Sequence, residues 1–298
     1  MKCKENGFQH PHKIRNMQQQ QQPFIQKSWI RVLLFLLCYL FLLLLSGNLW
    51  EQLPETIRNG KDLPVPFLYL PLLYNFIAGS VLVIFFRKAF DRQSLSSLGF
   101  VWKQFGRERL AGVLTATALL CGIASVLWWM QLLKWYTLPV PVLSLLLVSG
   151  LMILVAAGEE LVFRGYVLNN LLEGQRKPVA LFFSALAFAL FHSLNPEFNL
   201  SAFLNILLAG ILTGLNYLYT RNLWFGICFH FTWNWLQGPV LGFTVSGLEL
   251  PSLLQQDLNG SVLLTGGAFG LEASWLTTVL LMMALPLLHR LFLSYYRR

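Results

Sequence analysis

Long stretches almost free of charged residues recur along the whole chain and constrain its fold more than any other feature. A helix needs roughly 20 mostly apolar residues to cross a bilayer, and eight segments come near that length. Of the 298 residues, 56% are hydrophobic and 12% are charged, which excludes a disordered chain and argues against a soluble two-domain protein. We therefore predict an all-α fold, a polytopic membrane helical bundle of about eight transmembrane helices. The segments are residues 32–50, 63–86, 110–133, 135–172, 178–194, 198–220, 222–240 and 273–293.

The fourth segment, residues 135–172, is too long for a single crossing. Pro139 and Pro141 are predicted to mark the start of its helix, because proline is favoured in the first turn over the helix interior. Its second half carries charged residues. We therefore expect one long helix whose end leaves the lipid or faces a polar interior.

The residues before the first segment form a different kind of region. They include five consecutive glutamines, Gln18 to Gln22, among several lysine, arginine and histidine residues. Such low-complexity polar sequence does not build a packed core. We predict a disordered cytoplasmic tail over residues 1–28 and one helical membrane domain over residues 29–298. The first apolar segment is too long for the core of a signal peptide, so it is expected to remain as a helix.

Lysine and arginine residues indicate the orientation of the bundle. When the connections between the eight segments are assigned to alternate sides, 19 of the 22 basic residues fall on one side. The positive-inside rule therefore predicts that both termini are cytoplasmic. The net charge of +9 could also suggest nucleic acid, but no basic stripe with interleaved aromatic residues is present. The expected partner is the lipid bilayer, and not nucleic acid.

Three of the apolar segments carry polar clusters, which are costly in lipid and are tolerated where they face a bundle interior or a wet cavity. Glu160 and Arg164 are four residues apart and share one helix face, where they can pair. Glu159 points about 100° away and is left free. His230 and Asn234 are also four apart and project together. The clusters lie in residues 158–165, 188–192 and 230–234.

These clusters also lie at matching depths. If the fourth and fifth segments form a hairpin, Glu159 and His192 each lie 13 residues from the turn that closes it. At ~1.5 Å per residue, both are roughly 20 Å from that turn. Counted from the same side, His230 lies roughly 12 Å and Asn234 roughly 18 Å into the bundle. A carboxylate, two imidazoles and an amide are therefore expected to converge, and a hydrolytic site uses such groups.

The three clusters, taken in order, resemble the signature of the CAAX-protease and bacteriocin-processing family of intramembrane proteases, which includes the type II CAAX prenyl endopeptidases. The family motifs are Glu-Glu-x-x-x-Arg, Phe-x-x-x-His and His-x-x-x-Asn (or Asp). Each motif alone is unspecific, whereas the ordered triple is specific. The motif region spans residues 149–236, roughly a third of the chain. The matching residues are Glu159, Glu160 and Arg164, then Phe188 and His192, then His230 and Asn234.

The resemblance implies an intramembrane endopeptidase that acts on membrane-associated protein or peptide substrates, in CAAX-type or leader-peptide processing. It implies that Glu159 and His192 hold and deprotonate a water molecule. It further implies that His230 and Asn234 donate hydrogen bonds to the oxyanion. The supporting residues would be Glu160 and Arg164, because the arginine neutralises the second carboxylate.

The role of a metal stays open at this point. Glu159, His192 and His230 offer one carboxylate and two imidazoles, the ligand set of a catalytic zinc or another divalent metal. Against this, the HExxH spacing of soluble zinc peptidases is absent. If Glu159 were a metal ligand, Glu160 would have to be the general base, although it turns towards Arg164. Without a metal every motif residue has a role. We therefore favour a metal-independent, glutamate-dependent mechanism and keep zinc as the alternative.

The same polar pocket also allows a different class of function. A non-proteolytic membrane transporter or scaffold would use it to hold a proton, an ion or a partner helix. Because no motif position departs from the pattern, we favour the enzyme.

Other polar and small residues in the apolar segments are given structural roles. Asn205 is expected to form interhelical hydrogen bonds, while Gly210 and Gly214 allow close packing of helices. Glu272 is the one outlying acid. It is expected to begin the last helix on the far side of the membrane, away from the proposed site.

Overall fold

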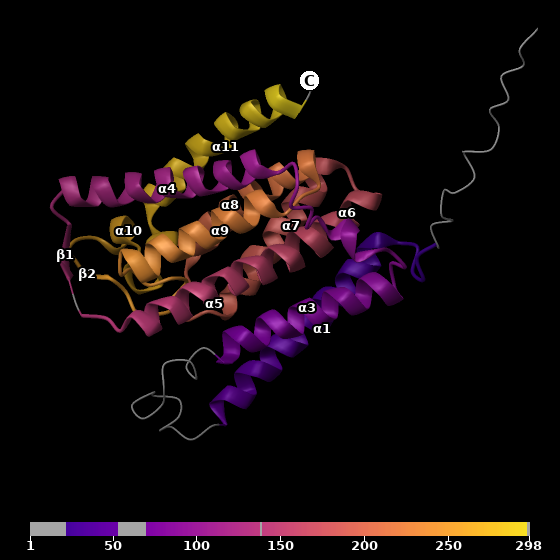
Figure 1. Ribbon diagram of the computed structural model, residues 1–298, viewed down its shortest axis with the longest axis horizontal. Coiled ribbons are helices and arrows are strands. Elements are labelled where there is room, and N and C mark those ends of the chain that lie inside the picture. Colours follow the sequence, from indigo (N-terminus) through magenta and orange to yellow (C-terminus); the bar gives the residue numbers. More distant parts are fainter. Residues whose placement is uncertain (1–21, 53–69, 138, 297–298) are drawn as a thin grey trace, which may run out of the picture.

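The computed structural model describes residues 22–52, 70–137 and 139–296, so most of the predicted N-terminal tail lies outside the described residues. Within the described residues, seven helices are long and apolar enough to cross a membrane. The predicted all-helical, polytopic bundle is therefore confirmed (Figure 1). The helices of 12 residues or more are α1 (Ser28–Glu51), α3 (Leu70–Ala89), α4 (Gly106–Trp129), α5 (Val142–Glu160), α7 (Lys177–Phe191), α8 (Leu200–Thr220), α9 (Trp224–Trp235) and α11 (Trp275–Tyr296).

Shorter elements connect or extend these helices. The α-helical pieces are α6 (Asn169–Gly174) and α10 (Val262–Thr265). The π-helical stretches are η3 (Leu161–Leu168) and η5 (Leu236–Val240). The 3-10 turns are η2 (Leu95–Leu98), η4 (His192–Leu194), η6 (Gly267–Phe269) and η7 (Leu271–Ala273). Among the described residues, the strands are β1 (Leu133–Thr137) and β2 (Leu254–Leu258).

The long fourth segment is one continuous helix of 33 residues, Val142–Gly174, made of α5, η3 and α6. It begins directly after Pro141, as predicted. Residues 135–137 differ from the prediction, because they belong to β1 and not to a membrane helix. This strand pairs antiparallel with β2, with Leu133 opposite Leu258. Pro139 and Pro141 follow β1, and Pro141, with φ −58° and ψ 126°, lies directly before the helix.

The expected segment 222–240 is shorter than a usual crossing. It forms a 12-residue helix, α9, followed by the 5-residue π-helical stretch η5, which contains Pro239. This is why seven long helices are found where about eight crossings were predicted. The part of the second expected segment before Leu70 lies outside the described residues.

Helix α9 lies at the centre of the packing that builds the site. It contacts α4, α5 and α8, while α7 packs on α8 and α3 packs on α5. Figure 1 shows α9 running between α4 and α5, with the α1–α3 pair beyond α5. Helix α9 approaches α4 very closely, since a Cβ added at Gly112 would lie 2.5 Å from the carbonyl oxygen of Phe225. The covered position of α9 places its polar residues inside the bundle.

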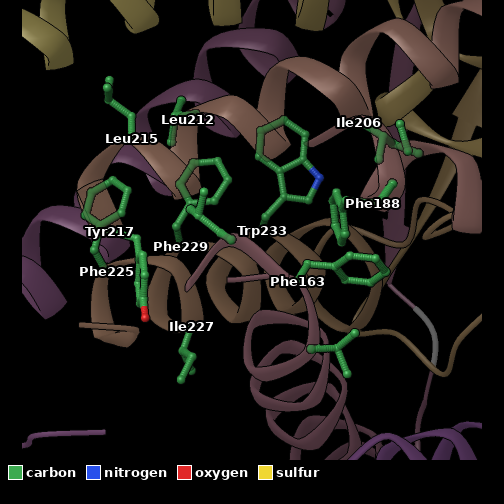
Figure 2. Packing of buried hydrophobic residues seen from close by; sticks show 14 of the residues in the cluster. Phe163, Phe188, Ile206, Leu212, Leu215, Tyr217, Phe225, Ile227, Phe229 and Trp233 are labelled. Carbon is green, nitrogen blue, oxygen red and sulfur yellow. The ribbon is translucent and has the colours of Figure 1, made fainter. Parts of the chain in front are cut away.

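Aromatic side chains fill the core beside these helices. Phe163 and Phe188 meet edge to face with ring centroids 5.2 Å apart, and Figure 2 shows both rings near Trp233 of α9. Gly210 and Gly214 lie where α8 meets α7, as predicted for close packing. A Cβ at Gly214 would lie 2.5 Å from Leu181 Cδ1. Many large apolar side chains on the outer helix faces remain exposed, as expected for surfaces in contact with lipid.

Candidate active site

The two adjacent glutamates at the end of α5 lie in different surroundings. Glu160 Oε1 is 3.0 Å from Arg164 Nη1, and both side chains are 1% exposed. This confirms the pairing predicted from their spacing. Arg164 also donates to the carbonyl oxygen of Gly210 at 3.2 Å and lies over the ring of Phe188, 4.3 Å from its centroid. The pair lies on α5 and η3 and is held by contacts from α7 and α8.

The Glu159 side chain is 27% exposed and points to the two motif histidines. Its Oε2 atom lies 3.6 Å from His192 Nε2 and 3.8 Å from His230 Nε2. Glu159 comes from α5, His192 from the first residue of η4 directly after α7, and His230 from α9. The three helices thus bring together the carboxylate and the two imidazoles that were expected to meet at one depth.

The two imidazoles are held differently. His192 Nδ1 lies 2.8 Å from the carbonyl oxygen of Phe188, one helical turn earlier. His230 has a carboxylate oxygen near each ring nitrogen, because its Nδ1 is 3.5 Å from Glu160 Oε1 and its Nε2 is near Glu159. Glu160 therefore turns towards Arg164, as expected, but it also lies beside His230.

A glycine explains why Glu160 reaches α9. A Cβ added at Gly226 would lie 2.5 Å from Glu160 Oε2, so any other residue would push the carboxylate away. Gly226 lies four residues before His230 on α9 and therefore on the same helix face. The close approach of the two helices at this glycine brings the Glu160 carboxylate within reach of the imidazole.

Two cavities meet at these residues. The larger, of about 130 Å³, is lined by Glu159 and by side chains of α1, α3 and α5, among them Tyr39 and Phe76. The smaller, of about 50 Å³, is lined by Glu160, Arg164 and mostly apolar side chains. Four residues line both cavities: His192, His230, Asn234 and Ser246. The four predicted catalytic residues thus surround one space.

The position of Glu272 corrects the prediction made for it. This acid lines the smaller cavity beside the motif residues and does not lie away from the site. Its Oε2 atom accepts from the Ser246 backbone N–H at 2.9 Å and from Gln237 Nε2 at 2.8 Å, and its Oε1 accepts from Ser246 Oγ at 3.2 Å. Burial raises the pKa of the Glu272 carboxyl to about 7.

Asn205 is the reason that Glu272 lies inside. Its Nδ2 donates to the carbonyl oxygens of Glu272 and Ser274, both at 2.8 Å, and its Oδ1 accepts from Thr278 of α11 at 2.6 Å. The interhelical role predicted for Asn205 is confirmed. These bonds fold the chain before α11 back onto α8, which turns the acid into the bundle. Ser246 and Gln237, which meet that acid, belong to no motif, and no sequence signal singled them out.

The arrangement of the candidate metal ligands can be compared with what a metal needs. Among the described residues, no three His, Cys, Asp or Glu side chains form a group that could hold a metal ion. Glu159, His192 and His230 have the chemistry of a zinc ligand set, but zinc requires each ligand atom at about 2.0–2.2 Å from a common point. The Glu159 oxygen lies 3.6 and 3.8 Å from the two ring nitrogens, separations that two ligands of one zinc ion can have, so these three residues stay the candidate ligands of the zinc alternative.

Comparison with known proteins adds one finding. The family model described as type II CAAX prenyl endopeptidase Rce1-like matches residues 140–236. This stretch begins just before α5 and ends at the C-terminal end of α9. It contains all three motifs, whereas Ser246 and Glu272 lie beyond it. No curated protein and no solved structure matches the chain. The resemblance drawn from the motifs is thus confirmed over residues 140–236, the part of the chain that matches the Rce1-like type II CAAX prenyl endopeptidases.

Proposed function

We propose that this chain is an intramembrane endopeptidase that hydrolyses peptide bonds of membrane-associated proteins or peptides. One observation carries the proposal: Glu159 meets His192 at 3.6 Å and His230 at 3.8 Å, from three helices of an apolar bundle. All three residues lie inside the matched region, whose family description points to CAAX-type processing. Processing of a leader peptide would use the same groups.

The attacking water would be held by Glu159 and His192. The carbonyl oxygen of Phe188 can only accept, so His192 Nδ1 carries the proton of that hydrogen bond. Nε2 of the neutral ring is then an acceptor that faces Glu159. Glu159 Oε2 is buried and accepts no hydrogen bond from the described residues, which is unusual for a carboxylate. One water molecule that donates to both acceptors would join Glu159 Oε2 and His192 Nε2.

His230 and Asn234 would stabilise the oxyanion. Each ring nitrogen of His230 faces a carboxylate oxygen, and both can donate only when the ring is protonated. Glu160, itself neutralised by Arg164, holds the Nδ1 side of the ring. The Nε2–H group is then free to donate towards the centre. The amide of Asn234, one turn further along the same helix, supplies a second donor.

The reaction then proceeds by simple proton transfers. The water oxygen attacks the carbonyl carbon while one water proton passes to Glu159. The carbonyl oxygen becomes the oxyanion held by His230 and Asn234. When the C–N bond breaks, the leaving nitrogen takes the proton from Glu159, which gives a carboxyl product and an amine product.

We also propose that this hydrolysis needs no metal ion. Every motif residue has a role without one, and the HExxH spacing of soluble zinc peptidases is absent from the sequence. Elemental analysis of the purified active protein, with activity measured after exhaustive chelation, tests this. Stoichiometric zinc that is lost together with activity, and that restores activity when added back, would overturn the proposal and make Glu159, His192 and His230 ligands.

The decisive test of the function replaces the proposed base. Membranes that contain wild-type protein or the Glu159→Gln variant are compared, and peptides that are lost or accumulate are identified. Purified Glu159→Gln should lose at least ~100-fold of the activity on such a substrate. The matched control is Glu197→Gln, the same change at an exposed loop acid that lines neither cavity. Full turnover by Glu159→Gln would end the proposal in this form.

We further propose that both termini are cytoplasmic and that the site opens towards the cytoplasmic half of the bundle. The support is the uneven distribution of lysine and arginine between alternate connections. Lys177 begins α7, and Glu197 follows its far end, so the two residues are expected on opposite sides of the membrane.

A further inference from the structure

The residues shared by the two cavities suggest one more participant. Three of the four, His192, His230 and Asn234, already have roles in the proposed reaction. The fourth is Ser246, which comes from the segment between η5 and β2, outside every motif. Under the proposed function, a polar side chain that lines both cavities would lie beside the bond to be cleaved.

Ser246 is held in a rigid turn. Val245 and Leu248 exchange both backbone hydrogen bonds at 2.9 Å, and the two residues between them have positive φ angles, +48° at Ser246 and +81° at Gly247. The Gly247 N–H donates to the carbonyl oxygen of Phe269 at 3.0 Å. A Cβ at Gly247 would lie 2.3 Å from the carbonyl oxygen of Pro196. The turn is therefore fixed against two other parts of the chain.

Glu272 determines how the Ser246 hydroxyl is oriented. The hydroxyl lies 3.2 Å from Glu272 Oε1, and the backbone N–H of the same serine donates to Oε2 at 2.9 Å. An ionised carboxylate can only accept, so the hydroxyl proton is directed at Glu272. The lone pairs of Ser246 Oγ are then left for the cavities, and Ser246 offers the substrate an acceptor.

We propose that Ser246 Oγ accepts a hydrogen bond from the N–H of the scissile amide. The inference rests on the proposed function. In that reaction the carbonyl oxygen of the amide is bound by donors, whereas its N–H group still needs an acceptor. A buried N–H left without a partner loses the hydrogen bonds it had in water, which costs free energy. Ser246 is the shared residue that meets this need and holds the leaving nitrogen in place.

Paired substrates test the hydrogen bond directly. The probes are a synthetic peptide that spans a cleavage site found in the membrane comparison and its ester analogue, in which oxygen replaces the scissile N–H. At pH 8, Ser246→Ala should lower kcat/KM about tenfold on the amide and less than about twofold on the ester. Ser246→Gly should do the same. Glycine removes the hydroxyl but tolerates the positive φ angle, so this variant keeps the turn.

A second serine in the same part of the chain is the control. Ser261 is exposed, caps α10 by accepting from the Leu263 N–H, and lines neither cavity. Ser261→Ala should leave both substrates unaffected. Equal losses on amide and ester, or no loss on the amide, would overturn the assignment while the proposed function stands. A wild-type protein that hydrolyses neither substrate would refute the proposed function, and the assignment with it.

Discussion

A buried cluster of charges outside the site gives the sharpest stability prediction. Asp91, two residues after the end of α3, is 0% exposed. Its carboxylate accepts from Arg31 Nη1 of α1 at 2.6 Å, from Arg87 Nη1 at 2.9 Å and from Asn170 Nδ2 of α6 at 3.2 Å. Arg31 also pairs with Glu173, whose side chain is 40% exposed. One carboxylate thus joins α1, α3 and the end of the long helix.

The Asp91→Asn variant keeps the shape of this side chain and removes its charge. Its amide nitrogen would face guanidinium groups that only donate. Breaking a buried ion pair by removing one partner costs about 3–5 kcal/mol. Arg31 keeps Glu173, while Arg87 keeps only hydrogen bonds to Ser97 Oγ, at 2.8 and 3.0 Å. We therefore expect the lower end of that range, about 3 kcal/mol of unfolding free energy.

Denaturant titration of the purified protein in detergent micelles measures this loss. The matched control is Asp257→Asn, the same change at an exposed position of β2, which should stay within about 0.5 kcal/mol of wild type. Combining Asp91→Asn with Arg87→Met should recover part of the loss, because the unpaired buried charge is then gone. A loss below about 1 kcal/mol for Asp91→Asn, or no recovery in the double variant, would refute the reasoning.

Four further predictions follow from the site and the topology. In assays of kcat, His230→Ala should cost at least ~100-fold and Asn234→Ala less, since His230 retains part of the oxyanion contact. Arg164→Ala should lower the melting temperature, because Glu160 is left uncompensated at 1% exposure. Raising the pH from 4.5 to about 7 should lower the melting temperature of the wild type. Burial makes the folded state hold the Glu272 proton that the unfolded state releases over this range. Glu272→Gln should therefore flatten the profile of melting temperature against pH over the same range. Single cysteines in a cysteine-free background should react with a membrane-impermeant reagent from outside at positions 197 and 255 but not at 177.

The helical bundle and the three motifs were predictable because both depend on local spacing. Apolar length marks the membrane helices, and the four-residue interval between Glu160 and Arg164 predicts the ion pair that the structure contains at 3.0 Å. Matching the depths along α5, α7 and α9 also required only the rise of a helix. The regular part of the molecule therefore follows from periodicity.

The parts that sequence reasoning missed depend on contacts between distant segments. Glu272 was placed outside because it precedes the last helix, yet bonds from Asn205 on α8 fold that segment inwards. Arg31 and Arg87 were counted as cytoplasmic charges. Arg87 lies four residues before Asp91 and within reach of it, but nothing in the spacing of Arg31 indicated that it meets the same acid, because these two residues are 60 apart in the chain. Strand β1 was missed in the same way, since its partner β2 lies more than a hundred residues later.

The two adjacent glutamates show how packing can give one residue type two tasks. Glu160 is almost fully buried, neutralised by Arg164, and pressed against Gly226, so it can position His230 but has little room for water. Glu159 is turned by one residue, lines the larger cavity and is 27% exposed, so water and substrate can reach it. Their side chains have the same intrinsic acidity. In the proposed reaction the general base is therefore selected by helix geometry and by one glycine on α9, which together decide which carboxylate faces the cavity.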